Sequence, residues 1–405
     1  MRRHILAIIT RYVLKQIIEP FFLALIAFTS VLLVDRVFIL TKYFVEKGVN
    51  PWYMVEMLFY YSPAALVLTV PMACLVGIIT AFGRMSEDNE IIAMKTAGIG
   101  MQKLIIPVVV SSLLLSVFMI FFMDFGIPEG NKAYTKLYTE IRQKNPALVL
   151  EPDTIMEEMS EEGRKWYFKS LDEKTGIMRH LRIWEKSGIT PNLITAKEGK
   201  IHYYDKWASL DLYDGAMYQV DPKGAHKGYT IVNFTENKVI LDISKSLDKE
   251  NRSGYSPRSM SIKELKSELE KIYKETESPS TLAYVKEFNL KRLIPEYRVE
   301  LYKKISIPFA NLAFGLIGVP LGLMVRRGGR MVGLGVGVGL IIVYYVILTA
   351  GEKLSKTVMF PPILGAWTPN ILMALAGIFL IVKTIREAPI HTLSIINKLF
   401  PKESE

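Results

Sequence analysis

Five long runs without a charged residue determine the architecture that this chain can adopt. They cover residues 57–82, 104–123, 305–325, 331–351 and 357–382. Each run reaches the ~20 residues that an α-helix needs to cross the hydrocarbon core of a bilayer. A sixth run, 20–34, is shorter, but it becomes a full span if the helix continues through Asp35 and Arg36 to Leu40. The sequence therefore predicts an α-helical membrane protein with six transmembrane helices.

The first span is predicted to be an uncleaved anchor. A cleavable signal peptide has a short basic segment that is followed at once by its apolar run. Here the basic start is followed only by a brief apolar patch, and Arg11, Lys15 and Glu19 precede the long run. Residues 1–15 combine basic and apolar side chains in an amphipathic pattern, so we expect them to lie along the inner membrane surface.

The distribution of basic residues predicts the orientation of the six spans. The loops and tails on one side hold 14 Lys and Arg, whereas the two short loops on the other side hold five. Because basic residues stay on the cytoplasmic side, both termini are predicted to be cytoplasmic. The long segment 126–303 then lies outside, where 30 Lys and Arg nearly balance 28 Asp and Glu. Nearly all of the net charge of +10 therefore belongs to the membrane part and its flanks and gives no reason to expect a nucleic acid.

The outer segment has the period of two that is typical of β-strands. Ala208, Leu210 and Leu212 alternate with polar residues. Turn sequences separate such runs at 172–176, Ser187-Gly188, Asp214-Gly215 and 221–224. We expect six to nine short strands in an antiparallel sandwich or an open jelly roll. The predicted domains are an N-terminal membrane half (1–125), an outer β-domain with flanking helices (126–303) and a C-terminal membrane half (304–405).

A polar stretch between the second and third spans predicts a short cytoplasmic helix, 86–98. In RMSEDNEIIAMKTAGIG, residues 84–100, Ser86 is placed to cap the first turn and Gly98 to end the helix. A solvated turn between two spans would explain the same residues. The alternative is a docking helix that takes mechanical work from a soluble motor through a projecting ridge of Ile91 and Met94. The residues assigned to this coupling role are Arg84, Glu87, Asp88, Glu90, Ile91, Met94 and Lys95.

The sequence contains no motif of an enzyme or of a metal site. It has no Gly-x-x-x-x-Gly-Lys-Ser/Thr loop, so energy from a nucleotide would have to come through a partner. The five histidines are scattered along the chain, and the single cysteine, Cys74, lies in the second span. We therefore assign no catalytic residue, no metal ligand and no cofactor to this chain.

The second membrane half contains the most specific signals. The stretch VELYKKISIPFANLAFGLIGVPLGLMVRRGGRMVGLGVG, 299–337, and GAWTPN, 365–370, closely resemble the LptF/LptG family of lipopolysaccharide-transport permeases. The resemblance extends over essentially the whole chain, including SEDNEIIAMKTAG and the outer segment ITAKEGKIHYYDKWASLDLYDGAMYQV. The Arg-Gly-Gly-Arg turn at 327–330 is the most specific single match.

This resemblance implies membership of an export complex in the bacterial inner membrane. Two such permeases, copies or paralogues, would pair, and their cytoplasmic helices would rest on a dimeric LptB-type ATPase that uses ATP and Mg. Their periplasmic jelly rolls would pass lipopolysaccharide to LptC- and LptA-type periplasmic proteins.

The phosphates of such a lipid would meet basic residues at the outer rim of the membrane part, and its acyl chains would enter an apolar cavity between the two subunits. Lys and Arg are suited to phosphate capture at this interface. The candidate substrate-binding residues are Arg36, Lys42, Lys132, Lys136, Arg298, Lys303 and Lys304. Two other functions remain open. One is a permease that moves its outer domain against a periplasmic partner without lipid passing through, and the other is a structural anchor of the envelope.

Overall fold

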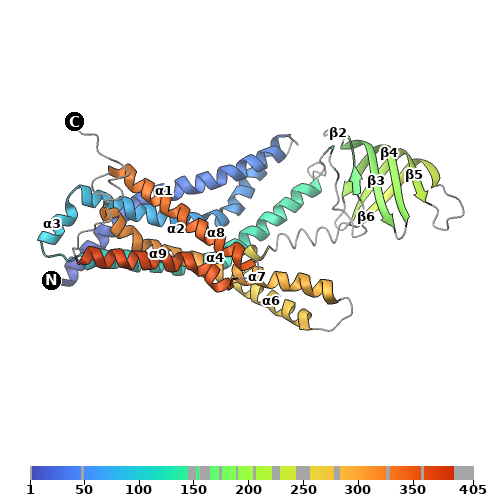
Figure 1. The fold of residues 1–405 in the computed structure, drawn as a ribbon. Helices are drawn as coiled ribbons and strands as arrows, with labels where there is room; N and C mark the ends of the chain where they lie inside the picture. Colours follow the sequence, from blue (N-terminus) through green and yellow to red (C-terminus); the bar gives the residue numbers. More distant parts are fainter. Residues whose placement is uncertain are drawn as a thin grey trace, which may run out of the picture. The chain divides into compact units, whose positions relative to one another are not determined.

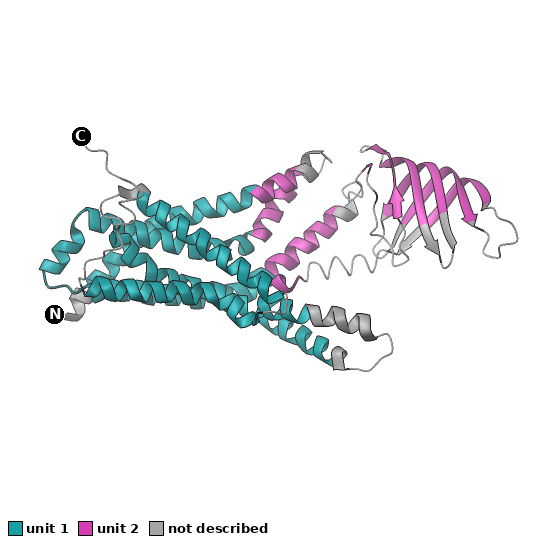
Figure 2. Cartoon of the chain, viewed as in Figure 1, with its two compact units in different colours: residues 1–34, 62–128, 260–405 teal, residues 35–61, 129–259 magenta. Residues whose placement is uncertain are grey.

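The chain divides into two compact units (Figure 2). Unit 1 comprises Met1–Val34, Ser62–Pro128 and Met260–Glu405, and unit 2 comprises Asp35–Tyr61 and Glu129–Ser259. The C-terminal part of the first span and the N-terminal part of the second thus belong to the same unit as the strand segment and not to the unit of the first membrane half. The computed structural model describes residues 2–46, 50–144, 152–153, 155, 165–172, 176–187, 190–203, 207–220, 229–242, 256–277, 283–324, 329–356 and 360–386.

Among these described residues, six helices are long and apolar enough to cross a membrane, three before and three after the strands, as predicted. They are α1 (Arg2–Glu46), α2 (Pro51–Glu87), α4 (Met101–Lys144), α7 (Ala283–Met324), α8 (Gly329–Lys356) and α9 (Pro362–Ile385) (Figure 1). α1 continues without a break through Asp35 and Arg36. With a rise of ~1.5 Å per residue, the 45-residue α1 and the 44-residue α4 are about twice as long as the ~30 Å hydrocarbon core. Their ends therefore reach beyond the membrane.

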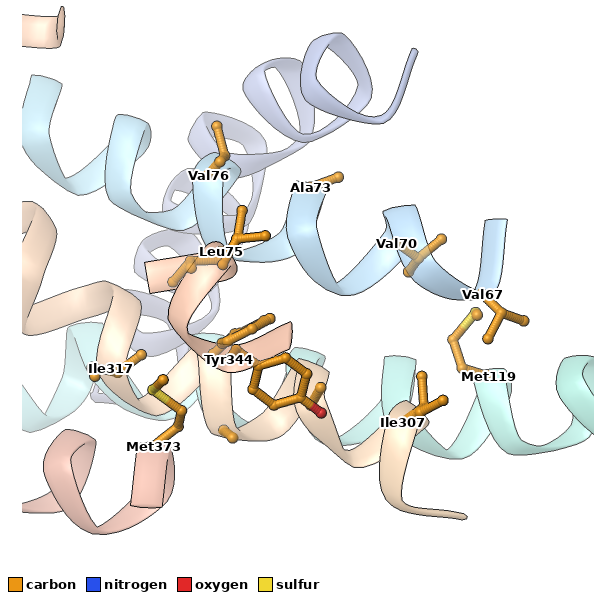
Figure 3. Packing of buried hydrophobic residues seen from close by; sticks show 14 of the residues in the cluster. Val67, Val70, Ala73, Leu75, Val76, Met119, Ile307, Ile317, Tyr344 and Met373 are labelled. Atoms are coloured by element: carbon orange, nitrogen blue, oxygen red, sulfur yellow. The ribbon is translucent and has the colours of Figure 1, made fainter. Parts of the chain in front are cut away.

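The core of unit 1 is apolar and draws on all the long helices (Figure 3). The Phe314 and Tyr344 rings meet edge to face with centroids 4.9 Å apart. Small residues let α7 approach α2 closely, since a Cβ on Gly318 would lie 3.0 Å from Ile78 and one on Gly322 would lie 2.9 Å from the Ile79 carbonyl oxygen. Such close approach favours helix association in a bilayer, where packing replaces the hydrophobic effect as the driving force.

A buried polar network joins α7, α8 and α9. The side-chain amide of Asn370 donates to the carbonyl oxygen of Ser306 at 2.6 Å, and its oxygen accepts from the Tyr344 hydroxyl at 3.0 Å. A Cβ on Gly351 would lie only 2.4 Å from the Gly365 carbonyl oxygen, so α8 and α9 touch through their backbones. Gly365 and Asn370 belong to the GAWTPN segment. That segment therefore fastens three helices into one packing arrangement.

α1 packs antiparallel to α2 with much of its own surface uncovered. A Cβ on Gly77 would lie 3.0 Å from the Phe21 Cα, and the hydroxyls of Thr29 and Thr69 share a hydrogen bond of 3.0 Å. In the most apolar 18-residue stretch of α1, only 6% of the residues are buried. In the most apolar 18-residue stretch of α2, 78% are buried. Most of this part of α1 is thus open to lipid or to another membrane helix.

The C-terminal parts of α1 and α4 and the N-terminal part of α2 share a small apolar core in unit 2. Its buried members are Leu40, Met57, Leu137 and Ile141. Tyr53, Tyr60 and Tyr134 pack against it with partly exposed side chains. Tyrosine rings are enriched at membrane–water interfaces, because they combine an apolar body with a polar tip. This core explains why these helix ends belong to unit 2.

Unit 2 also contains an antiparallel sheet, which is six-stranded over the described residues. Its strands are β1 (Lys165–Tyr167), β2 (Ser170–Asp172), β3 (Ile177–Ser187), β4 (Thr190–Tyr203), β5 (Trp207–Val220) and β6 (Tyr229–Asp242). Their order is β1-β3-β4-β5-β6, with β2 also paired to β3. The insert of antiparallel strands is confirmed, but β3 to β6 are 11–14 residues long, longer than the short strands predicted.

The predicted turn at Asp214-Gly215 is wrong, because the strand continues through both residues. Both residues lie inside β5, and Asp214 takes a positive φ of 50° there. His180 takes a positive φ of 57° inside β3, and both residues are skipped in the strand pairing. A Cβ on Gly215 would lie 2.3 Å from the Phe234 ring, so only glycine fits under that ring. These residues therefore bend the sheet and do not end a strand.

The bend changes which residues face the core of the sheet. Leu210 and Leu212 face it before the bend, and Met217, at an odd-numbered position, faces it afterwards. The other predicted turns fall between strands: the Gly176 N–H donates to the Asp172 carbonyl at 2.8 Å, and the β3–β4 hairpin closes after Ser187. Residues 173–175, 188–189 and 221–224 of these turns lie outside the described part of the chain.

Two helical segments follow the sheet in sequence, η2 (Pro257–Ser259) and α6 (Ile262–Glu277). α6 begins with a capping box, in which the Ser261 N–H donates to Glu264 at 2.7 Å and the Glu264 N–H donates to the Ser261 hydroxyl at 3.2 Å. The Asp124 carboxylate of α4 accepts from the next N–H, that of Ile262, at 2.6 Å. The start of α6 is thus fastened to a membrane helix.

Candidate functional site

The predicted coupling segment consists of the end of α2, a turn and α3 (Glu90–Thr96). α2 continues through Ser86 to Glu87, so the predicted cap at Ser86 is wrong; its hydroxyl instead donates to the Leu323 carbonyl at 3.5 Å. The helix breaks at Asn89, whose φ of 58° is left-handed, a conformation that asparagine tolerates better than most residues. α3 is therefore shorter than the predicted helix 86–98.

The end of α3 is a Schellman motif, as the position of Gly98 predicts. Gly98 has a φ of 79°, and its N–H donates to the Lys95 carbonyl at 3.0 Å. The Ile99 N–H donates to the Met94 carbonyl at 2.9 Å, and both of these side chains pack against the same apolar cluster. The segment is thus an ordered structure and not a loose turn.

The apolar side of α3 faces the bundle. Ile91 is buried and Met94 packs against the same cluster, together with Ile9 and Val13 of α1. The predicted projecting ridge of Ile91 and Met94 is therefore wrong, because these side chains anchor α3. The exposed residues between Glu87 and Gly98 are Glu87, Asp88, Asn89, Ile92, Ala93, Thr96, Ala97 and Gly98. Ile92 is the large apolar side chain among them and is 43% exposed.

Polar interactions of Tyr12 and Gln16 join α1 to the coupling segment. The Tyr12 hydroxyl donates to the Glu90 carboxylate at 2.6 Å. The Arg84 guanidinium donates to the side-chain oxygen of Gln16, one turn further along α1. Of the predicted coupling residues, Arg84 and Glu90 thus contact α1, and Lys95 is half-buried. Sequence reasoning missed Tyr12, because its partner lies 78 residues away and leaves no local pattern.

Four of the predicted rim residues belong to unit 2, namely Arg36, Lys42, Lys132 and Lys136. The Arg36 guanidinium lies 4.7 Å from the centre of the Tyr61 ring, a cation–π geometry between α1 and α2. Lys132 is exposed and pairs with Glu129 at 3.3 Å, one turn away on α4. Lys136 is also exposed. The side chain of Lys42, a fourth predicted rim residue, lies outside the described part.

Lys303 lies inside the bundle of unit 1. Its ammonium donates to Glu352 of α8 at 2.8 Å and to Glu300 at 3.1 Å, and its side chain is 8% exposed. Glu352 also pairs with Lys356 at 2.9 Å, and Lys356 with Glu296 at 3.5 Å. This network joins α7 to α8. Lys303 is thus engaged by carboxylates and does not stand at an open rim in this structure.

Lys304 and Arg298 complete the predicted set. Lys304 is fully buried, and its ammonium donates to the Met123 carbonyl at 3.2 Å in the field of Asp124. Arg298 is exposed, with its guanidinium 5.7 Å from the centre of the Tyr273 ring. Four of the described candidates, Arg36, Lys132, Lys136 and Arg298, are thus at least partly accessible to an anion, whereas Lys303 and Lys304 hold helices together.

Comparison with known protein families finds a match over most of the chain. A model of the family described as Lipopolysaccharide export system permease LptF/LptG matches residues 11–383. The matched range begins in α1 and ends in α9, so it includes the coupling segment, the sheet and both membrane halves. A search of curated proteins finds no match.

Proposed function

The chain belongs to the LptF/LptG family of lipopolysaccharide export permeases, and from this premise we propose that it is one of two permease subunits in an ATP-driven exporter. Family membership makes it a membrane subunit of a transport system and not a catalytic enzyme. In the proposed cycle, it removes lipopolysaccharide from the outer leaflet of the bacterial inner membrane. Its periplasmic strand domain then passes the lipid to LptC- and LptA-type proteins, while both termini remain in the cytoplasm.

The coupling segment supports an ATPase of the LptB type as the source of work. It presents the exposed acids Glu87 and Asp88 and the exposed Ile92, which would suit a partner surface with basic and apolar residues. Its support is rigid, since Ile91 is buried and a Schellman motif fixes the following loop. A rigid, exposed element is what a mechanical connection requires. ATP and Mg would bind to the ATPase.

The open surface of α1 supports a second permease subunit with lipid between the two. Phe22, Leu23 and Ile26 are more than half exposed on this helix. In a bilayer such a surface contacts either acyl chains or another helix, because both are equally apolar. At the outer part of the same helix, Arg36 is held on Tyr61 with its charge available to a phosphate.

The sheet supports contact with an acyl chain, but at a different place from the one predicted. An open jelly roll would offer an apolar groove on its inward-facing strand positions, but Leu210 and Leu212 are 1% and 0% exposed and form a closed core. Beyond the bend, Val232 is paired with Met217 on the same face and is 48% exposed. The proposed lipid contact therefore moves to Val232 and the neighbouring Phe234.

The match over residues 11–383 is the observation that carries this proposal. The test is to extract the complex in detergent, identify its subunits and bound lipid, and measure ATP-dependent release of lipopolysaccharide from vesicles to a periplasmic acceptor. We expect an ATPase, a second permease and bound lipid, with release that requires ATP. A complex that moves its outer domain with ATP but never contacts lipid would support the mechanical alternative. Isolation without any ATPase would support the structural anchor.

A further inference from the structure

We infer that Tyr12 is a positioning residue that ties α3 to α1, so that a displacement of α3 is passed directly to the first span. This role rests on the proposed function, because a motor must supply the displacement. The contact itself is independent of that function. The hydrogen bond joins α1 directly to α3, which are distant in sequence, and does not pass through α2.

The contact has the geometry of a strong hydrogen bond. The Tyr12 hydroxyl lies 2.6 Å from the Glu90 carboxylate, and charge-assisted O–H···O bonds have this length. Glu90 is the first residue of α3, immediately after the left-handed Asn89. The bond thus holds α3 at the point where the chain has just broken away from α2.

Burial on both sides of this bond makes the connection stiff. Ile9 and Val13, which flank Tyr12 on α1, are buried in the same cluster as Ile91. One turn further along α1, Gln16 accepts from Arg84, so α1 also holds the end of α2. α1 and α3 therefore meet through an apolar contact and a hydrogen bond side by side.

Because most of the apolar part of α1 is not covered by other helices, α1 can move when α3 is displaced. In the most apolar 18-residue stretch of α1, 6% of the residues are buried, whereas 78% are buried in that of α2. Neighbouring helices therefore cover most of the apolar stretch of α2. A push on α3 therefore meets less resistance from α1 than from α2. Without the Tyr12 bond, α3 would pivot about Asn89, and the same push would displace the coupling helix alone.

The first measurement tests the tie in the isolated full-length chain. Tyr12→Phe removes the hydroxyl and keeps the ring. Tyr60→Phe is the matched control, since the Tyr60 hydroxyl donates to Glu56 at 3.0 Å within a single helix. Hydrogen exchange of the α3 amides should accelerate about tenfold in Tyr12→Phe, which equals about 1.4 kcal/mol, the scale of one hydrogen bond. Exchange in α9 should not change in either variant, which excludes general misfolding.

The second measurement tests the transfer of displacement in the complex with its ATPase. Tyr12→Phe should lower lipopolysaccharide release per ATP hydrolysed about fivefold, the scale of an ordinary coupling energy. The Tyr60→Phe complex should match the wild type. Unchanged α3 exchange in Tyr12→Phe would overturn the tie. Faster exchange with unchanged release per ATP would overturn the transfer and leave Tyr12 a structural residue.

The two measurements also separate this inference from the proposed function. If the wild-type complex releases no lipopolysaccharide with ATP, the proposed function fails and the transfer of displacement to α1 fails with it. The exchange of the α3 amides still decides whether Tyr12 ties α3 to α1.

Discussion

Replacing Glu352 by glutamine tests whether Lys303 holds helices together or serves as a phosphate ligand. Glu352 accepts from Lys303 at 2.8 Å and from Lys356 at 2.9 Å, and so links α7 to α8. Glu352→Gln keeps the shape of the side chain and one acceptor oxygen but removes the negative charge. Lys303 then retains a single carboxylate, that of Glu300 at 3.1 Å.

The expected loss of stability follows from this geometry. Removing one partner of a buried ion pair costs about 3–5 kcal/mol when the other charge is left alone. Two features reduce the loss here, because Glu352 is 13% exposed and Glu300 still neutralises Lys303. We therefore expect about 2 kcal/mol of destabilisation, which lowers the Tm of this 405-residue chain by about 2–3 °C at ~2.1 cal/mol/K of unfolding entropy per residue.

Thermal unfolding of the purified chain in detergent, followed by circular dichroism, measures this loss. Glu268→Gln is the control, since Glu268 pairs with Lys271 on the surface of α6 and exposed pairs contribute about 1 kcal/mol or less. Lipopolysaccharide binding is measured on the same samples. If Glu352 instead competes with phosphate for Lys303, the variant binds lipid more tightly and keeps its Tm. That combination would refute the structural role of the network.

Three further predictions concern the exposed surfaces. Arg36→Glu should weaken lipopolysaccharide binding at least about tenfold more than Arg36→Lys, because it turns attraction to phosphate into repulsion; equal binding losses would assign Arg36 to packing. A photo-crosslinker at Val232 should label lipopolysaccharide when ATP is supplied, whereas one at the buried Leu212 should not, and equal labelling would contradict the proposed lipid contact. Asp88→Lys combined with Ile92→Glu should weaken binding of the ATPase about ten- to a hundredfold, since both side chains are exposed; unchanged affinity in a pull-down titration would remove this surface from the interface.

The membrane architecture could be predicted because its signal is local. Each charge-free run is by itself long and apolar enough to form one span. α1 continues through Asp35 and Arg36, as the thickness of the bilayer requires. The environment of Lys303 could not be predicted in this way. Its partner Glu352 lies 49 residues away on another helix, so the sequence shows two charges near span ends and nothing that joins them.

The predicted helix and strand boundaries are wrong where one local sequence signal fits two structures. Ser86, Asp88 and Asn89 are all good helix caps, and the sequence offers no rule for choosing among them. Packing decides, because Met85 and Ser86 are buried and extend α2 to Glu87. Asp-Gly likewise serves both a hairpin turn and a bend within a strand. Pairing of β5 with β4 and β6 on both sides of Asp214 selects the bend.

We expect the ion pairs of α7 to affect how this chain enters the membrane during synthesis. Glu300, Lys303 and Lys304 reach the translocation channel while α8 is still being made. A charge at the centre of an inserting helix costs about 2.5–3.5 kcal/mol and less toward its end, and these charges adjoin the charge-free run 305–325, so we expect α7 to enter lipid less readily alone than with Glu352 beside Lys303. Glu352 follows Lys303 by 49 residues, a delay of about 2–10 s at ~5–20 residues per second. α7 is therefore expected to stay beside the channel until α8 arrives, and the two helices leave it as a neutralised hairpin.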